Sequence, residues 1–588
     1  MVSNEKKIRG KLRENGVKGN WRIYILMLSI FFVAVAIASR LYYLQVISCE
    51  SYRAIAENQH NFSRELHPER GEIYLRNESG NYPIAVNREY QMAYAVPAEM
   101  EQEDKDKAVY AISSVLGIDE NILREKFSDD KDQFEILKHK LSDEEISKIN
   151  ELKIVGVYLR GEVFRYYPAD VLASQVIGFV GSDGESFRGR YGIESYWEEE
   201  LSGEKGVLTQ ERDAGGRWIS ISDRNLQPAK NGPDLLLTID YAVQFEAEKI
   251  LSKAVEEHGA DEGSVVVMDP KTGRILAVAG APSFSPNEYS QVDDMSKFMN
   301  SSVSGAYESG SVFKPITMAI AIDDGKVTPE STYVDTGQVL EAGYVIKNSD
   351  EKAYGKQTMT QVLEESLNTG VIHIERLVGN KTFAEYVRRF GFGEKSGIEL
   401  PGESAGNINN LKALNRDIQF FTASFGQGIT TTPLQLANAY STIANGGKLM
   451  RPQIVYKIIH SSGKEEEIEP QEIRRVIRED TAEQVSQMLR SVVVNGHGKR
   501  ADVPGYLVGG KTGTAQVASS TVKGYEEGIN VGSFVGFAPT NDPMFVIAVK
   551  IYNPKNVVWA ESSAAPVFGE IMKFLLEHYN VEPTEEIK

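Results

Sequence analysis

The chain has 588 residues, with 64 Lys and Arg against 83 Asp and Glu, a net charge of −19, 41% hydrophobic residues and one cysteine. This composition is ordinary for a folded, water-facing protein, and the length predicts about four domain-sized units. Cys49 alone excludes an intramolecular disulfide framework and any multi-cysteine zinc or iron–sulfur site. The negative charge argues against nucleic acid as a partner, because a nucleic-acid-binding surface needs a basic stripe.

A basic N-terminus precedes an apolar segment. The first 22 residues carry seven Lys and Arg against two Glu, which leaves a charge of about −24 on the rest. Residues 23–39 carry no charge, and counting on to Val46 passes the roughly 20 residues that a bilayer core requires. We therefore predict a cytoplasmic basic tail over 1–22, a single membrane helix over 23–46, and an extracytoplasmic remainder. A cleaved signal peptide is the alternative, but no small-residue cleavage site follows the apolar run directly.

Two regions are expected beyond the membrane segment. From 47 to 235, short strand-like runs (QMAYAV, VIGFVG) accompany a polar helical block at about 104–155, where apolar residues recur at helical spacing. A Pro/Gly/Asn linker, 227–234, closes this first region. LLLTID and a helical pattern open the second region, 236–580, and 581–588 is an acidic tail.

The second region is predicted to be an antiparallel sheet packed against a helical lobe. Residues 263–280 form two β-rich runs around a turn, which predicts a hairpin. Three more strand candidates, YLVGGKTGTAQVA, SFVGFAPT and MFVIAVKIYN, lie near the end of the chain. The intervening 300–500 is mostly helical in pattern, so distant segments must join to close one sheet. The fold class is therefore α+β.

Short catalytic motifs are present but ambiguous. In S-x-x-K, one helical turn separates a hydroxyl from an amine, so a neutral Lys can take the Ser proton. This pattern starts at seven serines, at least six of them coincidental: 3, 128, 202, 311, 349, 461 and 520. K-[ST]-G occurs at Lys271, Lys395 and Lys511, and the first belongs to the predicted hairpin turn.

The context of Ser311 separates it from the other serines. A glycine precedes Ser311 and a long apolar-periodic helix follows, which places Ser311 and Lys314 in its first turn, where Pro315 is tolerated. The positive end of this helix favours an oxyanion at Ser311. Simple capping of the helix by Ser311 is the equally weighted alternative.

Two further segments complete a candidate site. Ser366 and Asn368 follow at the end of a helical stretch, where a polar turn is the simpler interpretation. Lys511 lies on a strand candidate with Thr512, Gly513 and Thr514. A strand edge with a cation, two hydroxyls and a glycine where backbone must approach closely is suited to grip a carboxylate.

The order S-x-x-K, S-x-N, K-T-G-T resembles the serine penicillin-binding proteins. The resemblance covers nearly the whole chain and includes these further landmarks: PERGEIYLRN (68–77), RYYPADVLASQVIGFVG (165–181), YGIESYWEEELSG (191–203), LTID (237–240) and SFGQGITTTPLQLANAYSTIANGG (424–447). Together they resemble class B, the monofunctional transpeptidases, and ESLNTG and LPGE look more like the division and spore-septum branch. Three positions depart from the family pattern: Ser309 where Pro is common, Leu367 where Ser is common, and Leu75 where Asp is usual.

The resemblance implies a membrane helix, an elongated α+β pedestal over 47–235 and a β-lactamase-like transpeptidase domain over 236–580. It implies a peptidoglycan D,D-transpeptidase that cross-links stem peptides from lipid-linked precursor and binds β-lactams covalently, without metal or cofactor. The implied catalytic residues are Ser311, Lys314, Ser366, Asn368 and Lys511, with Thr512, Gly513 and Thr514 as substrate-binding residues. The backbone N–H groups of Ser311 and Thr514 are the implied oxyanion hole.

The resemblance also implies a place in the bacterial cell membrane and partners there, namely a SEDS-family glycosyltransferase and division or elongation proteins. Two other functions stay open on the sequence: a β-lactam sensor or catalytically idle division scaffold, and a membrane-tethered serine β-lactamase. A β-lactamase would have no use for a pedestal of this length. A bifunctional enzyme is disfavoured, because 47–235 lacks the E-D-x-x-F pattern of glycan polymerases.

Overall fold

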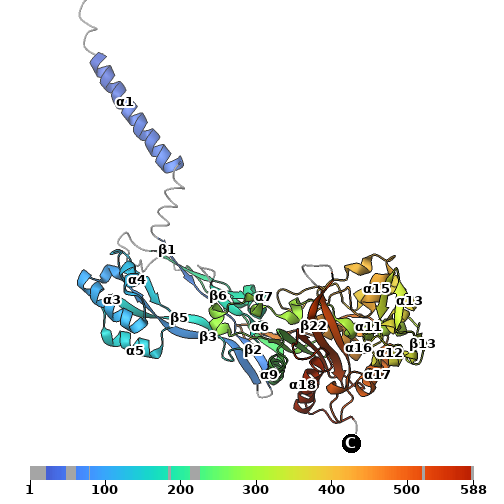
Figure 1. Ribbon diagram of the computed structural model, residues 1–588. Helices are drawn as coiled ribbons and strands as arrows, with labels where there is room; N and C mark the ends of the chain where they lie inside the picture. The colour runs from blue at the N-terminus through green and yellow to red at the C-terminus, as the bar shows by residue number, and fades with distance from the viewer. Residues whose placement is uncertain are drawn as a thin grey trace, which may run out of the picture. The chain divides into compact units, whose positions relative to one another are not determined.

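The computed structural model describes residues 21–47, 61–77, 80–182, 187–211, 225–518 and 524–584 (Figure 1). The chain divides into two compact units, one of Met1–Pro68 with Glu204–Lys230 and one of Glu69–Gly203 with Asn231–Lys588. Residues 1–20 of the predicted basic tail, Cys49 and the last four residues of the predicted acidic tail lie outside the described residues.

The first unit holds the apolar helix and a small sheet. Helix α1 spans Trp21–Tyr42 and continues as a π-helix, η1, over Tyr43–Ile47. This helical segment has a mean hydropathy of 2.2, none of its most apolar window is buried, and it is long enough to cross a membrane. The predicted helix over 23–46 is therefore confirmed as a helix. Strands β1 (Asn61–Leu66), β8 (Gly206–Glu211) and β9 (Asn225–Gln227) form an antiparallel sheet in the order β1-β8-β9.

The second unit begins with a sheet of seven strands drawn from distant parts of the chain. The order is β19-β18-β10-β2-β3-β4, and β5 also pairs with β3. The strands are β2 (Ile73–Asn77), β3 (Gly80–Ala95), β4 (Glu135–Lys138), β5 (Val157–Tyr166), β10 (Asp234–Asp240), β18 (Val455–Ile459) and β19 (Glu465–Glu467). Strand β10 pairs in parallel with β2 and antiparallel with β18. Residues on both sides of the 227–234 segment therefore share one sheet.

The predicted helical block consists of α3 (Gln102–Leu116), α4 (Glu120–Lys126) and α5 (Asp143–Leu152), beside the end of β3 and β5 (Figure 1). Apolar residues of α3, such as Ile112, pack with Leu123 and Ile149 in a separate small core. The helical interpretation was wrong at β4, because its backbone pairs with β3. A short 3-10 helix, η2 (Pro97–Glu99), precedes α3. The short elements after β5 are α6 (Ser174–Ile177), β6 (Phe179–Ser182), β7 (Phe187–Arg190), α7 (Gly192–Tyr196) and α8 (Glu198–Leu201).

A buried ion-pair network joins three of the sequence landmarks. Glu194, which is fully buried, accepts hydrogen bonds from Arg70 Nε at 2.8 Å and from Arg165 Nε at 2.6 Å. Arg70 also pairs with Glu198 at 2.7 Å, and Tyr167 Oη lies 3.4 Å from Glu194. The two arginines hold the pKa of Glu194 below its usual value in spite of its burial. The landmarks near 70, 165 and 194 thus hold the first half of this unit together.

The second sheet has five antiparallel strands in the order β12-β11-β23-β22-β21. They are β11 (Glu262–Met268), β12 (Ile275–Ala281), β21 (Gly509–Ala518), β22 (Tyr525–Ala538) and β23 (Phe545–Tyr552). The predicted hairpin, the three late strands and an antiparallel sheet closed from distant segments are confirmed. The prediction of one sheet in 236–580 was wrong, because β10, β18 and β19 join a sheet with strands of the first region instead.

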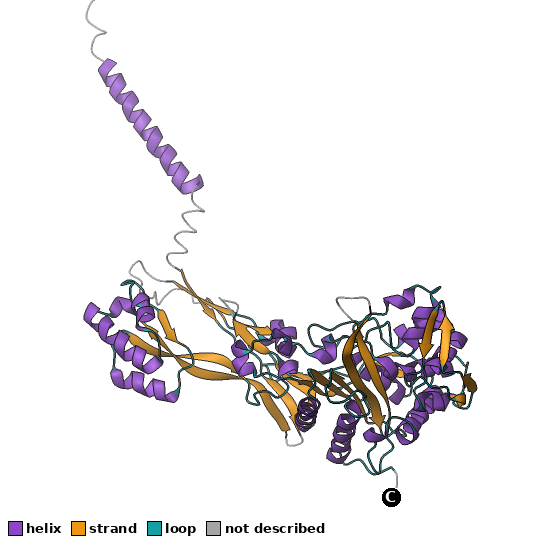
Figure 2. Cartoon of the chain, viewed as in Figure 1, coloured by secondary structure: helices purple, strands orange, loops and turns teal. Residues whose placement is uncertain are grey.

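Helices cover both faces of this sheet (Figure 2). Val265 and Val267 pack with α9 (Tyr241–His258) and α18 (Ala564–His578), whereas their neighbour Val266 belongs to the core of the helical lobe. This alternation follows from the two-residue period of a strand.

The helical lobe lies between the strands in sequence. Its helices are η3 (Pro286–Gln291), η4 (Met295–Phe298), α10 (Ser301–Ser304), η5 (Gly310–Phe313), α11 (Lys314–Asp323), α12 (Met359–Glu364), α13 (Asn368–Val378), α14 (Asn380–Arg389), η6 (Asn409–Lys412), α15 (Asp417–Ser424), α16 (Pro433–Ala444), α17 (Glu479–Asn495) and η7 (Lys499–Ala501). Three small strand pairs interrupt the predicted helical pattern: β13 (Thr332–Asp335) with β16 (Gly355–Thr358), β14 (Gln338–Glu341) with β15 (Tyr344–Lys347), and β17 (Lys448–Met450) with β20 (Glu472–Arg475).

Candidate active site

Ser311 lies in the 3-10 turn η5, and α11 begins at Lys314 with Pro315 in its first turn. Gly310 opens this turn with φ +60°, a left-handed conformation that glycine adopts without strain. Tyr440 of α16 donates its hydroxyl to the backbone oxygen of Val312 at 2.7 Å, and the Tyr440 ring is completely buried. A hydrogen bond from the buried helix α16 therefore holds the turn that carries Ser311 in place.

Strand β21 presses against this turn. A Cβ atom added at Gly513 would lie 2.8 Å from the backbone oxygen of Ser309 and 3.0 Å from the backbone nitrogen of Val312. Only glycine permits such an approach. As the sequence suggested for a glycine on this strand, the close contact brings Thr512 and Thr514 beside Ser311.

Lys314 connects the turn to the segment that carries Ser366. Lys314 Nζ donates to the backbone oxygen of Ser366 and lies 3.2 Å from Ser366 Oγ. Ser366 itself has φ +55°, which is unfavourable for a residue with a side chain. Leu367, where the family pattern has Ser, is completely buried in the lobe core, so this departure does not alter the site.

Two lysines at the site are completely buried. Burial lowers the pKa of Lys314 well below its ordinary value, and repulsion from the nearby Lys511 lowers it further. Burial lowers the pKa of Lys511 to about 7. Lys511 donates to the backbone oxygen of Thr512 at 3.1 Å. A neutral Lys314 next to Ser311 can accept the serine proton, while a cationic Lys511 can attract an anion.

A pocket of about 310 Å³ brings the three motif segments together. Its lining residues are Ser311, Ser349, Asp350, Lys352, Tyr354, Glu365, Ser366, His497, Thr512, Thr514, Trp559, Ala560 and Glu561. Ser349 and Lys352 form a second S-x-x-K pattern in the same pocket. The Lys352 side chain is 74% exposed and pairs with Asp350 at 3.4 Å, whereas Lys314 is buried, so only Ser311 has a desolvated base.

Asn368 does not line this pocket, although it begins α13 directly after Ser366 and Leu367. Its Nδ2 donates to the backbone oxygen of Lys347 at 2.8 Å. Thr514 accepts a hydrogen bond from the backbone nitrogen of Ala560 at 3.1 Å, which fixes the 559–561 segment against β21. The 559–561 segment and His497 belong to no recognisable motif, and the 349–354 loop carries only the ambiguous S-x-x-K pattern of Ser349 and Lys352, so the sequence did not place them at the site.

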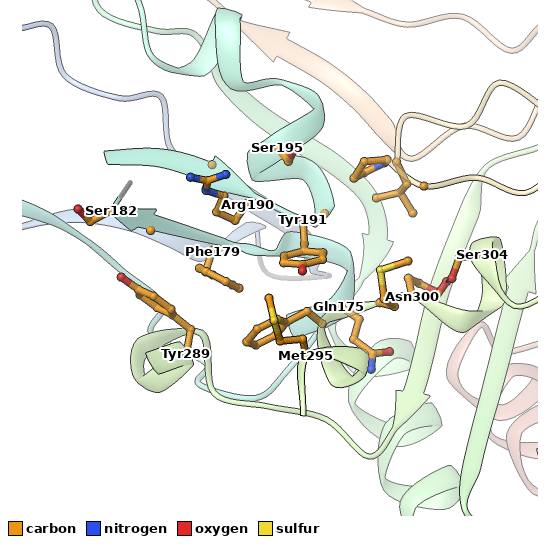
Figure 3. Close-up of a pocket in the computed structure, with 18 residues that line it drawn as sticks. Gln175, Phe179, Ser182, Arg190, Tyr191, Ser195, Tyr289, Met295, Asn300 and Ser304 are labelled. Atoms are coloured by element: carbon orange, nitrogen blue, oxygen red, sulfur yellow. The ribbon is translucent and has the colours of Figure 1, made fainter. Parts of the chain in front are cut away.

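A larger cavity of about 590 Å³ lies elsewhere in the second unit (Figure 3). One wall of it holds an aromatic cluster: Phe179 stacks on Tyr289 with ring centroids 4.3 Å apart and also contacts Phe298. None of the predicted catalytic residues lines it. We therefore expect catalysis at the smaller pocket, which is lined by Ser311 and by Ser366, the hydrogen-bond partner of the buried Lys314. Within the described ranges, no group of three or more His, Cys, Asp or Glu could hold a metal ion.

Two families of known proteins match most of this chain. Residues 263–573 match the penicillin binding protein transpeptidase domain, and residues 65–237 match the penicillin-binding protein dimerisation domain. The chain is 33% identical to Stage V sporulation protein D of Bacillus subtilis, over 97% of this chain and 88% of that one. It is 33% identical to the probable peptidoglycan D,D-transpeptidase PbpC of Pseudomonas aeruginosa, over 96% of each chain. The crystal structure of penicillin binding protein 3 from Mycobacterium tuberculosis with aztreonam matches with a TM-score of 0.68 and 26% identity, over 89% of this chain and 99% of that one.

Proposed function

Because this chain belongs to the class B penicillin-binding proteins and is a peptidoglycan D,D-transpeptidase that binds penicillin, we propose that its reaction proceeds through a covalent acyl-enzyme at Ser311. The observation that carries this proposal is the buried Lys314, which lies one helical turn after Ser311 and 3.2 Å from Ser366 Oγ and whose pKa is strongly lowered. A lysine that is neutral near pH 7 can act as a general base for a serine hydroxyl.

In the first step, Ser311 Oγ attacks the carbonyl carbon of the penultimate D-alanine, and its proton passes to Lys314 Nζ. The C–N bond then breaks, and the leaving D-alanine amine takes a proton that Ser366 relays from Lys314. An ester on Ser311 remains. The amine of a neighbouring stem peptide attacks this ester, the C–O bond breaks, and the proton returns to Ser311 Oγ through the same lysine.

The remaining motif residues bind and polarise the substrate. Lys511, Thr512 and Thr514 would hold the terminal carboxylate, and Asn368 the peptide amide. The close approach at Gly513 supports an oxyanion hole from the backbone N–H groups of Ser311 and Thr514. One such donor is typically worth about 3 kcal/mol of transition-state stabilisation.

Labelling with a fluorescent penicillin tests the nucleophile. The wild type and Ser349→Ala are expected to be labelled and Ser311→Ala is not, with the adduct located by mass spectrometry of the Ser311 peptide. An adduct on Ser349, or a labelled Ser311→Ala variant, would refute the assignment. Cross-linking of lipid-linked precursor separates the enzyme from a β-lactam sensor or idle scaffold, and slow release of the penicilloyl group separates it from a β-lactamase.

For the cell, we propose a single-pass protein with its N-terminus in the cytoplasm, its catalytic domain outside the membrane, and septal wall synthesis with a SEDS-family glycosyltransferase as its process. The apolar helix at Trp21–Ile47, the preceding basic residues and the resemblance of ESLNTG and LPGE to the division and spore-septum branch support this proposal. Protease accessibility of the catalytic domain in intact spheroplasts tests the topology. A fluorescent fusion at mid-cell or at the spore septum, rather than along the side wall, tests the process.

A further inference from the structure

A buried carboxylate beside the active-site pocket accepts an unusually complete set of hydrogen bonds. Asp335, at the end of β13, is 2% exposed. Its Oδ1 accepts from Thr369 Oγ1 at 2.6 Å and from the backbone nitrogen of Gly337 at 3.0 Å. Its Oδ2 accepts from Asn348 Nδ2 at 3.0 Å and from the backbone nitrogen of Tyr354 at 2.8 Å. These four bonds use the full acceptor capacity of a carboxylate.

The four donors come from three separate segments. Thr369 is the second residue of α13, directly after Asn368. Asn348 and Tyr354 are near the two ends of the loop 348–354, which we name the wall loop. Asn348 also accepts from the backbone nitrogen of Thr369 at 3.3 Å, and its Nδ2 donates to the backbone oxygen of Lys352 at 3.1 Å. Asp335 therefore fastens both ends of the wall loop to the helix that follows Ser366.

The wall loop contributes four of the residues that line the pocket: Ser349, Asp350, Lys352 and Tyr354. Within it, the Tyr354 hydroxyl donates to Asp350 Oδ2 at 2.7 Å, and the backbone nitrogen of Lys352 donates to Asp350 Oδ1 at 3.1 Å. The loop contains the second S-x-x-K pattern, Ser349 to Lys352, but none of the motifs to which the family resemblance assigns a role. Its position depends on the buried hydrogen bonds at Asp335 rather than on contacts with the catalytic lysines.

We propose that Asp335 is a positioning residue of the transpeptidase. By holding the wall loop, it shapes the part of the pocket that receives the peptide substrates, and it thereby favours transfer of the acyl group to an amine over transfer to water. The proposal rests on the acyl-enzyme at Ser311. A loosened wall would bind the donor peptide less well and would admit water to the ester, whereas a compact penicillin depends mainly on Ser311 and the β21 residues.

Asp335→Asn is the informative substitution, because it keeps the shape but turns one acceptor into a donor. If the new NH2 group replaces Oδ2, it points at the N–H donors of Asn348 and Tyr354. If it replaces Oδ1, it points at the backbone N–H of Gly337. Either orientation leaves a buried donor without an acceptor, which strains the junction. Asp323→Asn is the matched control. Asp323 is also a buried acceptor, for Tyr386 Oη at 2.6 Å, the Arg478 backbone nitrogen at 2.7 Å and Thr481 Oγ1 at 3.0 Å, but it lies at the far end of α11 from Lys314.

The experiment uses the detergent-solubilised full chain, with a D-alanyl-D-alanine donor peptide and an amine acceptor. Active sites are counted with fluorescent penicillin, and the transferred and hydrolysed products are measured separately. For Asp335→Asn we expect the KM for the donor peptide to rise about tenfold and the ratio of hydrolysis to transfer to rise severalfold, a size typical of misplaced positioning groups. Asp323→Asn is expected to reduce stability while leaving KM and the product ratio per active site unchanged.

A second variant, Asn348→Ala, tests the same role in case Asp335→Asn does not fold. Asn348→Ala removes one donor to Asp335 but leaves its bonds to Thr369 and Tyr354, and it should change KM and the product ratio in the same direction. Wild-type values for both variants, or losses confined to the number of active sites, would overturn the role of Asp335. Failure of the wild type to form an adduct at Ser311 would instead overturn the proposed function itself.

Discussion

Gly513→Ala tests the contact on which the active-site geometry depends. The new Cβ would lie 2.8 Å from the backbone oxygen of Ser309, whereas ordinary contacts begin at 3.4 Å, so strand β21 or the Ser311 turn must move by roughly 0.6 Å. The obstacle is backbone and cannot rotate away. A displacement approaching 1 Å in a catalytic site can cost about 100-fold in rate, so we expect penicillin acylation to slow by about 10- to 100-fold. Overpacking of this kind should also lower the free energy of unfolding by about 1–3 kcal/mol.

The assay is the second-order rate of acylation per folded molecule, together with chemical denaturation. Gly263→Ala serves as the control, because it introduces the same methyl group into the same sheet, 2.7 Å from the side-chain ends of Leu251 and Val255. It should reduce stability and leave acylation intact. Wild-type acylation in Gly513→Ala would show that the turn and the strand tolerate separation, and the proposed oxyanion hole would lose its support.

Further predictions concern charge. The second-order rate of penicillin acylation should follow a bell-shaped pH profile. The rate falls at low pH because Lys314 gains a proton below its lowered pKa and can no longer act as a base. It falls at high pH because Lys511 must be charged and loses its proton as the pH rises through about 7. Lys511→Arg, which stays charged, should remove the upper limb; a wild-type rate that climbs steadily to pH 9 would contradict this assignment. Glu194→Gln should lower the free energy of unfolding by about 3–5 kcal/mol in urea denaturation, because it leaves Arg165 as a buried charge without its carboxylate partner, whereas Arg70 keeps Glu198. An unchanged midpoint would show that these arginines find other acceptors.

The sequence predicted those parts of the fold that local pattern controls. The apolar helix, the 263–280 hairpin and the three late strands have strong periodicity, and the structure confirms them. Strand β4 was missed because its four residues lie among helical segments and gain their conformation only by pairing with β3. The same reason explains the small strand pairs of the lobe, such as β14 with β15, whose hydrogen bonds are not encoded in either segment alone.

For the site, motifs located the chemical groups but not their surroundings. The apolar helix that follows Ser311 favoured it over Ser349 in the sequence, and burial of the lysine is the further difference in the structure, since both serines precede a lysine by three residues and both line one pocket. No local pattern reveals that Lys314 is enclosed and Lys352 is not. Likewise, Asp335 lies 31 residues from Ser366 in the sequence, and its role depends on hydrogen bonds that only the folded chain brings together.

The mixed sheet has a practical consequence for protein engineering. A truncated chain that started just before β10 would retain Leu235 and Leu236 but delete β2, so a row of backbone donors and acceptors would become an unpaired edge. Such edges recruit other chains, and the fragment would tend to aggregate during expression. A chimera that takes its N-terminal half from a relative would therefore need a strand that can replace β2 as the partner of β10, because strands from both halves pair in one sheet.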